Sequence, residues 1–188
     1  ADYGDFEHHA NLIGTEFLQR CAADATCGER LGEDPQQFLR DLLDRLDQGH
    51  CAGANLRTAT LQSVMSGVLL GDQGLRSFIA PLLHRLDRCN GDDLEALAAF
   101  SRNLMPPAQE EGLQEFSLVL QNHIVLSELW SDPPRSAETL EDLIDGNLFA
   151  FHAAPSIAAS LDTWPRHDRP ADANEVASTQ VPLLMLVE

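Results

Sequence analysis

Asp34-Pro35 opens the most regular apolar pattern in the sequence, and this pattern constrains the fold more than any other feature. The apolar residues that follow recur three and four positions apart, which is the spacing of one face of an α-helix. They are Phe38, Leu39, Leu42, Leu43 and Leu46. An aspartate at the N-cap and a proline at the first helical position favour a helix start here, and Gly49 supplies a C-terminal stop. The pattern therefore predicts an amphipathic helix that begins at Pro35 and ends just before Gly49.

Helical spacing of apolar residues recurs along most of the remaining sequence. Leu and Ala, both strong helix formers, dominate the composition, whereas β-branched residues are sparse. Further helices are predicted over residues 11–21, 58–70, 92–104, 113–129, 136–144 and 155–161. Thr58, Asp92 and Ser136 are the expected N-caps of three of them. The expected fold class is all-α, an irregular bundle of about six to eight helices.

Two segments between these helices are less regular. Residues 22–34 are predicted to form a loop, because Gly28 and Gly32 are helix breakers. Pro81 precedes an apolar run in the middle of the chain. This part is either a helix that starts near Ala80 or a longer helix kinked at the proline.

The last eight residues differ in kind from the rest of the chain. The run VPLLMLV is short, continuous and apolar, and it follows a polar, irregular stretch over residues 163–180. A run of this kind predicts a buried strand of a parallel sheet. Because no other segment offers that strand a partner, we expect the sheet to lie in another part of a longer protein. The predicted organisation is a helical domain over residues 1–180, followed by the start of a core-sheet strand over residues 181–188.

Acidic residues far outnumber basic ones, at 30 against 12, and the net charge is −18. Such a chain repels nucleic acid, because binding needs cationic side chains that displace counterions from phosphates. It repels anionic membrane surfaces for the same reason, and no apolar run reaches the length of about 18 residues that a membrane span requires. We therefore predict neither a nucleic-acid partner nor a membrane partner. The charge is interpreted as a solvated acidic surface, with attraction of cationic or amine-bearing ligands as the alternative.

Four cysteines, Cys21, Cys27, Cys51 and Cys89, permit three disulfide connectivities. An even number at this low density is typical of exported proteins and favours a secreted or periplasmic location. The spacing matches no zinc-binding pattern, because there is no C-x-x-C pair and His50 beside Cys51 has no matching second pair. No metal site is predicted.

The sequence contains no recognisable catalytic motif. Ser66-Gly67 lacks the upstream glycine of the G-x-S-x-G nucleophile motif and falls inside a predicted helix. The glycines over residues 71–74 form a short turn without the Lys and Ser/Thr of a phosphate-binding loop. We therefore predict no catalytic residue and no cofactor for this chain.

One region does have the composition of a binding site. Glu128 and Trp130 end the apolar segment HIVLSELW, and Trp164 begins the irregular stretch that follows the last predicted helix. A carboxylate at the end of an apolar helix, beside an aromatic ring, can meet an ammonium group in a partly buried pocket. The alternative is a helix that ends at the surface with an ordinary exposed glutamate. Glu128 and Trp130 are the candidate substrate-binding residues.

Four segments, in this order, resemble the lid region of the tripeptidyl-aminopeptidase-like and prolyl-aminopeptidase-like α/β-hydrolases. They are FLQRCAADATCGERLG, FIAPLLHRLDRCNGDDLEAL, FSLVLQNHIVLSELW and STQVPLLMLVE. The first is similar to the family's paired-cysteine segment, and the last is similar to the strand that leads from the lid into the hydrolase sheet. The resemblance implies a disulfide between Cys21 and Cys27, with Cys51 and Cys89 as the second pair.

The resemblance implies a helical lid that carries no catalytic triad of its own. The parent enzyme would cleave ester or amide bonds by a Ser-His-Asp mechanism, with the serine before Ala1 and the other two residues after Glu188. The lid would cover the mouth of the active site, limit substrate size and exclude water. Its partners would be the hydrolase core of the parent chain and a peptide or ester substrate. By position, Glu128 would hold the free amine of the substrate, and Trp130 would form a wall of the pocket.

Two other interpretations remain open. The chain is alternatively a stand-alone acidic helical interaction module, whose last strand pairs with the sheet edge of a partner. An autonomous enzyme is disfavoured, because no nucleophile, base and orienting group are visible together. Without a sheet of its own, the apolar strand at residues 181–188 would present an exposed edge, so we predict a homodimer contact there.

Overall fold

The computed structural model of the protein describes residues 3–71, 73–104, 117–130 and 135–165. The described residues form the α-helices α1 (Phe6–Ala23), α2 (Ala25–Leu31), α3 (Pro35–Asp47), α4 (Thr58–Leu70), α5 (Gln73–Arg76), α6 (Ile79–Arg88), α7 (Gly91–Leu104), α8 (Leu118–Glu128), α9 (Ala137–Ile144) and α10 (Ala154–Ala158). Two of them, α5 and α10, have five residues or fewer. No strand occurs in the described residues, and the predicted all-α class is confirmed for them.

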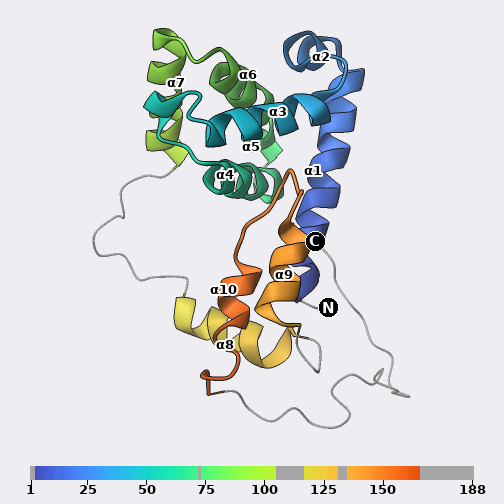
Figure 1. Cartoon of the computed structure of the whole chain (residues 1–188), viewed down its shortest axis with the longest axis vertical. Helices are drawn as coiled ribbons and strands as arrows, with labels where there is room; N and C mark the ends of the chain where they lie inside the picture. The colour runs from blue at the N-terminus through green and yellow to red at the C-terminus, as the bar shows by residue number, and fades with distance from the viewer. Residues whose placement is uncertain (1–2, 72, 105–116, 131–134, 166–188) are drawn as a thin grey trace.

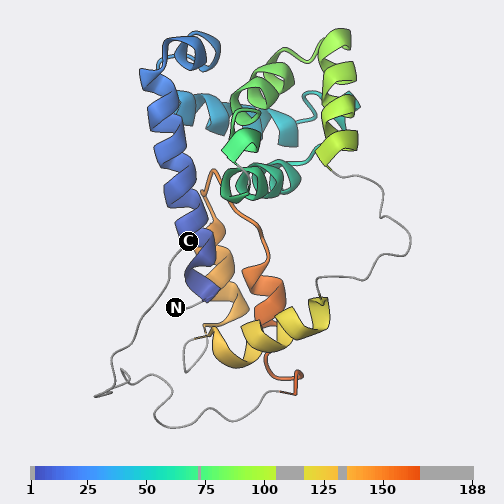
Figure 2. The same cartoon turned by 180° about the vertical axis from the view of Figure 1, so that it is seen from behind.

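The helices form two clusters that share the long helix α1. Helices α2–α7 lie to one side of one half of α1, and α9 lies beside the other half, with α8 and α10 next to it (Figure 1); the view from behind shows the same division (Figure 2). Helix α1 contacts α2, α3 and α4 in the first cluster and α9 in the second. Each cluster has its own apolar core. The first core is mainly leucine, and the second contains Val125, Leu126, Trp130, Leu140, Ala154 and Leu161.

The amphipathic helix predicted after Asp34 is confirmed as α3. The Asp34 side chain accepts a hydrogen bond from the backbone N–H of Gln37 at 2.9 Å, and Pro35 is the first residue of the helix. Gly49 follows the helix with a φ of 91°, a left-handed conformation that glycine adopts at little cost. The apolar stripe of α3 lies in the first core. Every one of these signals is local in the sequence.

The loop predicted over residues 22–34 is wrong, because α2 lies within this segment. Asp24 caps α2: its side chain accepts a hydrogen bond from the backbone N–H of Cys27 at 2.8 Å. A helix of seven residues is not stable by itself. Here it is held by the disulfide between Cys21 and Cys27 and by packing against α1 and α6.

Two of the predicted N-caps are also wrong. Asn90, rather than Asp92, caps α7: the Asn90 side chain accepts from the N–H of Asp93 at 3.0 Å, and the Asp93 carboxylate accepts from the N–H of Asn90 at 3.5 Å. This reciprocal pair satisfies two backbone donors at the helix start. Thr58 is the first residue of α4 rather than its cap. Its hydroxyl lies 2.6 Å from the carboxylate of Asp47 at the end of α3.

The starts of three further helices can be compared with the predictions. Helix α9 begins after Ser136, as predicted, and the Ser136 hydroxyl accepts from the N–H of Thr139 at 3.1 Å. Helix α6 begins at Ile79, so Pro81 lies in its first turn, where proline is tolerated, and not at a kink. Helix α1 begins at Phe6, five residues earlier than the periodic pattern indicated.

Two disulfides lie in the first cluster. One joins Cys21 near the end of α1 to Cys27 in α2, with their Cα atoms 5.2 Å apart. The other joins Cys51, after α3, to Cys89 at the end of α6, with their Cα atoms 5.5 Å apart. These are the pairs that the hydrolase resemblance implies. Disulfides are typical of proteins that fold in an oxidising compartment.

Some sequence predictions lie partly or wholly outside the described residues, among them the start of the helix predicted over residues 113–129. The strand over residues 181–188, the domain boundary at residue 180 and the homodimer contact all fall beyond Pro165. Within the described residues, no helix is both long enough and apolar enough to cross a membrane. The same residues contain no group of three or more His, Cys, Asp or Glu side chains placed to hold a metal ion.

Candidate functional site

The first turns of α1 anchor the chain segment that leads into α10. Glu7 is 1% exposed, and its carboxylate accepts hydrogen bonds from the backbone N–H groups of Phe151 at 2.6 Å and Ala153 at 2.9 Å. One turn further along the same helix face, the side-chain oxygen of Asn11 accepts from the N–H of Leu148 at 2.9 Å. A buried carboxylate is stable only when donors of this kind replace water. The anchor therefore fixes the second cluster against α1.

Four aromatic rings meet at this end of α1. The ring of Phe6 stacks on Tyr3, with centroids 5.6 Å apart, and on Phe151, with centroids 5.0 Å apart. The ring of Tyr3 also contacts that of Trp130, with centroids 5.7 Å apart. The backbone N–H of Tyr3 donates to the carbonyl of Leu129, which joins this aromatic group to the end of α8. The aromatic group thus contacts both α8 and the anchored segment.

A hollow of about 660 Å³ lies between the aromatic group and α8, and we call it the α8 hollow. It is lined by Tyr3, Phe6, Ser117, Leu120, Gln121, Ile124, Val125, Leu129, Phe151 and Ala153. Several of its apolar side chains face solvent: Phe6 is 36% exposed, Leu120 58% and Ile124 39%. The hollow is therefore an open, mainly apolar surface with a few polar groups, which is the usual composition of a small-molecule site.

Helix α8 is apolar on two sides. Val125 and Leu126 are buried in the second core, whereas Val119, Leu120 and Ile124 are exposed. A helix that is apolar all round is normally buried all round. Within the described residues, nothing covers the second apolar side of α8.

Burial raises the pKa of the Tyr3 hydroxyl, and the negative charge of Glu7 raises it further. Tyr3 therefore keeps its proton well above neutral pH. At neutral pH the Tyr3 hydroxyl at the α8 hollow is therefore uncharged.

Glu128 is not among the residues that line the α8 hollow, and Trp130 lies behind Tyr3, which does line it. Glu128 is the last residue of α8 and is exposed. It shares a helix face with Gln121 and Ile124, which line the hollow, because these positions are seven and four residues earlier. Trp130 is only 4% exposed and packs in the second core against Tyr3. Trp130 packs behind Tyr3, which lines the hollow, and its own ring does not face the solvent.

Sequence reasoning missed Glu7, Phe6 and Phe151 as members of this region. The segment around Glu7 shows no apolar periodicity, and its hydrogen-bond partners lie more than 140 positions later in the chain. Phe151 occupies an irregular segment between α9 and α10. No short-range pattern in the sequence connects these residues.

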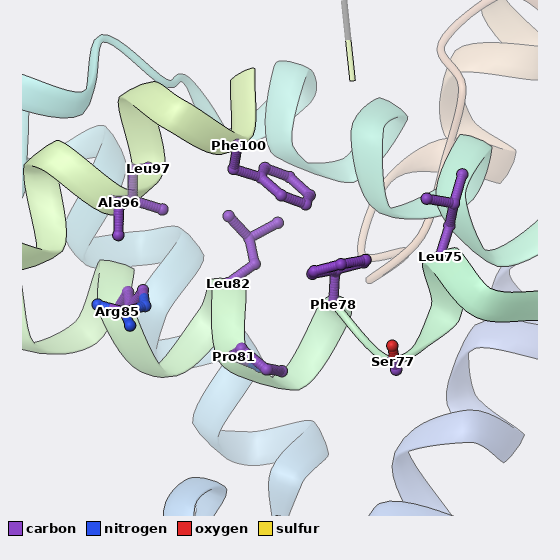
Figure 3. Close-up of a pocket in the computed structure, with 9 residues that line it drawn as sticks. All are labelled: Leu75, Ser77, Phe78, Pro81, Leu82, Arg85, Ala96, Leu97 and Phe100. Atoms are coloured by element: carbon purple, nitrogen blue, oxygen red, sulfur yellow. The ribbon is translucent and has the colours of Figure 1, made fainter. Parts of the chain in front are cut away.

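A second hollow lies in the first cluster between α6 and α7, and we call it the α6–α7 groove. Its volume is about 730 Å³. Figure 3 shows the side chains that line it: Leu75, Ser77, Phe78, Pro81, Leu82, Arg85, Ala96, Leu97 and Phe100. Phe78 is 46% exposed, and its ring contacts that of Phe100 with centroids 5.7 Å apart. The groove is apolar except where Arg85 and Ser77 border it.

Comparisons with protein-family profiles, with curated proteins and with solved structures find no match to this chain. Function is therefore inferred from the geometry of the described residues.

Proposed function

We propose that this chain is the helical, substrate-gating lid of a serine α/β-hydrolase, the class that its sequence resembles, and that α8 faces the mouth of the active site. The observation that carries this proposal is the second apolar side of α8, with Leu120 and Ile124 exposed beside an open apolar hollow. Such a surface favours contact with a further apolar surface. A hydrolase core together with an acyl group or an apolar substrate side chain provides one.

The positions of Tyr3 and Trp164 support the same arrangement. The backbone N–H of Tyr3 donates to Leu129 at the end of α8, and the indole N–H of Trp164 donates to Nδ1 of His123 in α8 at 3.3 Å. Both aromatic side chains pack against the second core. A lid inserted into a hydrolase needs both of its connections on the side that faces the enzyme. Tyr3 and Trp164 lie near the two ends of the described helices, and both contact α8. In the proposed lid, both connections to the enzyme would therefore lie on the side of α8.

In this arrangement the lid contributes apolar surface and excludes water from the reacting bond. Closing such a surface over an active site strengthens the electrostatic interactions inside it. Glu128, exposed at the end of α8, would bind the free amine of a peptide substrate through a charge-assisted hydrogen bond. The two disulfides support a secreted or periplasmic enzyme.

The complete reading frame of the gene provides the test. The proposal predicts a G-x-S-x-G motif before Ala1 and an aspartate and a histidine after Glu188. The protein made from that reading frame should react with a fluorophosphonate probe at the serine of this motif. Residues 1–188 produced alone should show no labelling and no ester hydrolysis above background. A reading frame without such a serine, or a labelled serine within residues 1–188, would overturn the proposal.

A further inference from the structure

Basic side chains gather at one end of the α6–α7 groove, although the chain has a net charge of −18. A second, smaller hollow of about 490 Å³ lies there. It is lined by Glu29, Arg30, Pro81, His84, Arg85 and Arg88. Pro81 and Arg85 line both hollows, so the apolar groove and the basic hollow adjoin each other across these two side chains.

The arginines at this end are only partly neutralised. Arg85 and Arg88 both donate to the same oxygen of Asp93, at 3.0 Å and 2.6 Å, and Asp93 is fully buried. The two arginine side chains nevertheless remain 40% and 48% exposed. Because a guanidinium group has five N–H donors, each keeps donors that do not face Asp93.

Arg30 adds a third guanidinium from α2, and Glu29 adds a second carboxylate. The side chains that line the smaller hollow, together with the buried Asp93, therefore carry three positive charges and two negative charges. The surplus is one positive charge, at the end of an apolar groove, in a chain whose overall charge is strongly negative. This combination is complementary to a ligand with a single negative charge on an apolar body.

We propose that the α6–α7 groove binds a medium-chain fatty acid, with the alkyl chain along Phe78, Leu82 and Phe100 and the carboxylate at Arg85 and Arg30. The volume of the groove and its apolar lining are typical of small-molecule sites. A guanidinium group presents paired donors that match the two oxygens of a carboxylate. Figure 3 shows the two phenyl rings and Leu82 on the groove side of α6 and α7, with Arg85 further along α6.

This site is separate from the proposed function. Helix α6 lies at one end of the molecule and α8 at the other (Figure 1). Fatty-acid binding in the groove therefore requires neither a hydrolase core nor a substrate in the α8 hollow. A reading frame without a catalytic serine would leave this proposal intact, and a failure to bind fatty acid would leave the lid proposal intact.

Isothermal titration of residues 1–188 with dodecanoate tests the proposal, and we expect saturable binding of one molecule per chain. Phe78→Ala should weaken binding about tenfold, because the alkyl chain loses part of its apolar contact area. The matched control is Leu12→Ala, since Leu12 is 50% exposed on α1, away from the groove. This control should bind dodecanoate as the unmodified chain does.

The charge is tested separately with Arg30→Gln, which should weaken dodecanoate binding about threefold, the effect expected of an exposed ion pair. It should leave the binding of dodecanol unchanged. Arg20→Gln on α1 is the control, because it removes the same charge from a side chain that is 79% exposed. Arg30 is itself exposed, so its replacement keeps the test valid even if the Phe78 variant fails to fold.

Three results would overturn the proposal. The first is the absence of saturable dodecanoate binding to the unmodified chain. The second is an equal loss of affinity in the Phe78→Ala and Leu12→Ala variants. The third is binding of dodecyltrimethylammonium as tight as that of dodecanoate, since the basic end of the groove should disfavour a cationic head group.

Discussion

The phenyl ring of Phe149 lies directly against Gly14 in the middle of α1, so close that a Cβ atom on Gly14 would overlap the ring. Phe149 is fully buried, and its backbone N–H donates to the side chain of Asn11 at 3.3 Å. The ring therefore has no room to move away. This contact determines how closely the segment between α9 and α10 approaches α1.

Replacing Gly14 with alanine should lower the free energy of unfolding by about 1–3 kcal/mol, because the new methyl group overpacks the site. Gly67 in α4 is the matched control. It is exposed, and the nearest atom to an added Cβ is Cε1 of Phe151 at an ordinary 3.9 Å. Gly67→Ala should raise stability by about 0.5–1 kcal/mol, since alanine is the better helix former. Urea midpoints that shift in the same direction for both variants would contradict this interpretation.

The Glu7 carboxylate is expected to contribute more to stability than an exposed carboxylate on the same helix. Glu7→Gln places an amide, which has only one acceptor oxygen, opposite several backbone N–H donors. The loss should be about 2 kcal/mol in urea unfolding, the value typical of hydrogen bonds to a charged group. Glu16→Gln on the same helix is the control. Glu16 is exposed and pairs with Arg20, so its change should be below about 0.5 kcal/mol.

Amide hydrogen exchange provides an independent check on the Glu7 anchor. The N–H groups of Phe151 and Ala153 should exchange faster in Glu7→Gln, while the helix interior of α3 keeps its protection. Unchanged exchange at Phe151 and Ala153 would show that the carboxylate does not hold this segment.

Asp93 should make stability depend on acid pH. The hydrogen bond from Arg88 holds the pKa of Asp93 below its ordinary value, with smaller contributions from Asn90 and Arg85. In the unfolded chain the carboxyl binds a proton at a higher pH than in the folded chain. Its contribution to stability is therefore complete above about pH 4 and is lost as the pH falls towards the lower folded-state pKa.

The measurement is urea unfolding at a series of pH values for the unmodified chain and for Asp93→Asn. The stability difference between the two should be largest near neutral pH and should shrink as the pH falls below about 4. Asp92→Asn is the control, because Asp92 is the exposed neighbour in the same helix turn. A stability difference for Asp93→Asn that stays constant across this pH range would exclude the proposed linkage.

The two disulfides should differ in their contribution to stability. Cys51 and Cys89 are 38 positions apart, whereas Cys21 and Cys27 are only 6 apart. A cross-link that closes a longer loop removes more conformational entropy from the unfolded chain. Replacing both members of the longer pair with alanine should cost about 4 kcal/mol, against about 2 kcal/mol for the shorter pair. Thermal unfolding of the two double variants compares them, and a larger loss for the shorter pair would contradict the entropic account.

Glu128 is expected to affect substrate choice in the full-length enzyme that we propose. Glu128→Gln should raise KM about tenfold for peptides with a free amino terminus, because a charge-assisted hydrogen bond is lost. Simple esters carry no amine and should be hydrolysed as before. Glu138→Gln on α9 is the control, since Glu138 is exposed in the first turn of another helix. An equal effect of Glu128→Gln on peptides and esters would exclude the amine-binding role.

The sequence predicted those parts of the fold whose signals are local. The start and end of α3 follow from Asp34, Pro35 and Gly49, which all lie within a residue or two of the helix. Ser136 predicted the start of α9 for the same reason. Helix α2 could not be predicted in this way, because its stability depends on a disulfide and on packing against α1 and α6.

The candidate site, too, could be predicted only where its signals are local in the sequence. The sequence predicted α8 as an apolar helix, but which of its sides is covered depends on α9, α10 and Tyr3. The buried state of Trp130 depends on its contact with Tyr3, more than 120 positions earlier. The anchoring role of Glu7 depends on backbone donors at the far end of the chain. Long-range contacts of this kind leave no periodic trace in a single sequence.

The anchor on α1 also determines the order in which the chain completes its structure during synthesis. Helices α2–α7, with both disulfides, end at Leu104, but Glu7 meets its partner Phe151 only 144 positions after itself. A nascent chain therefore has all of α2–α7 before it has Leu148 and Phe149, which complete the first core, and before Glu7 has its partner. The second cluster can dock onto α1 only after residue 151 has been made, and non-local contacts of this kind form slowly.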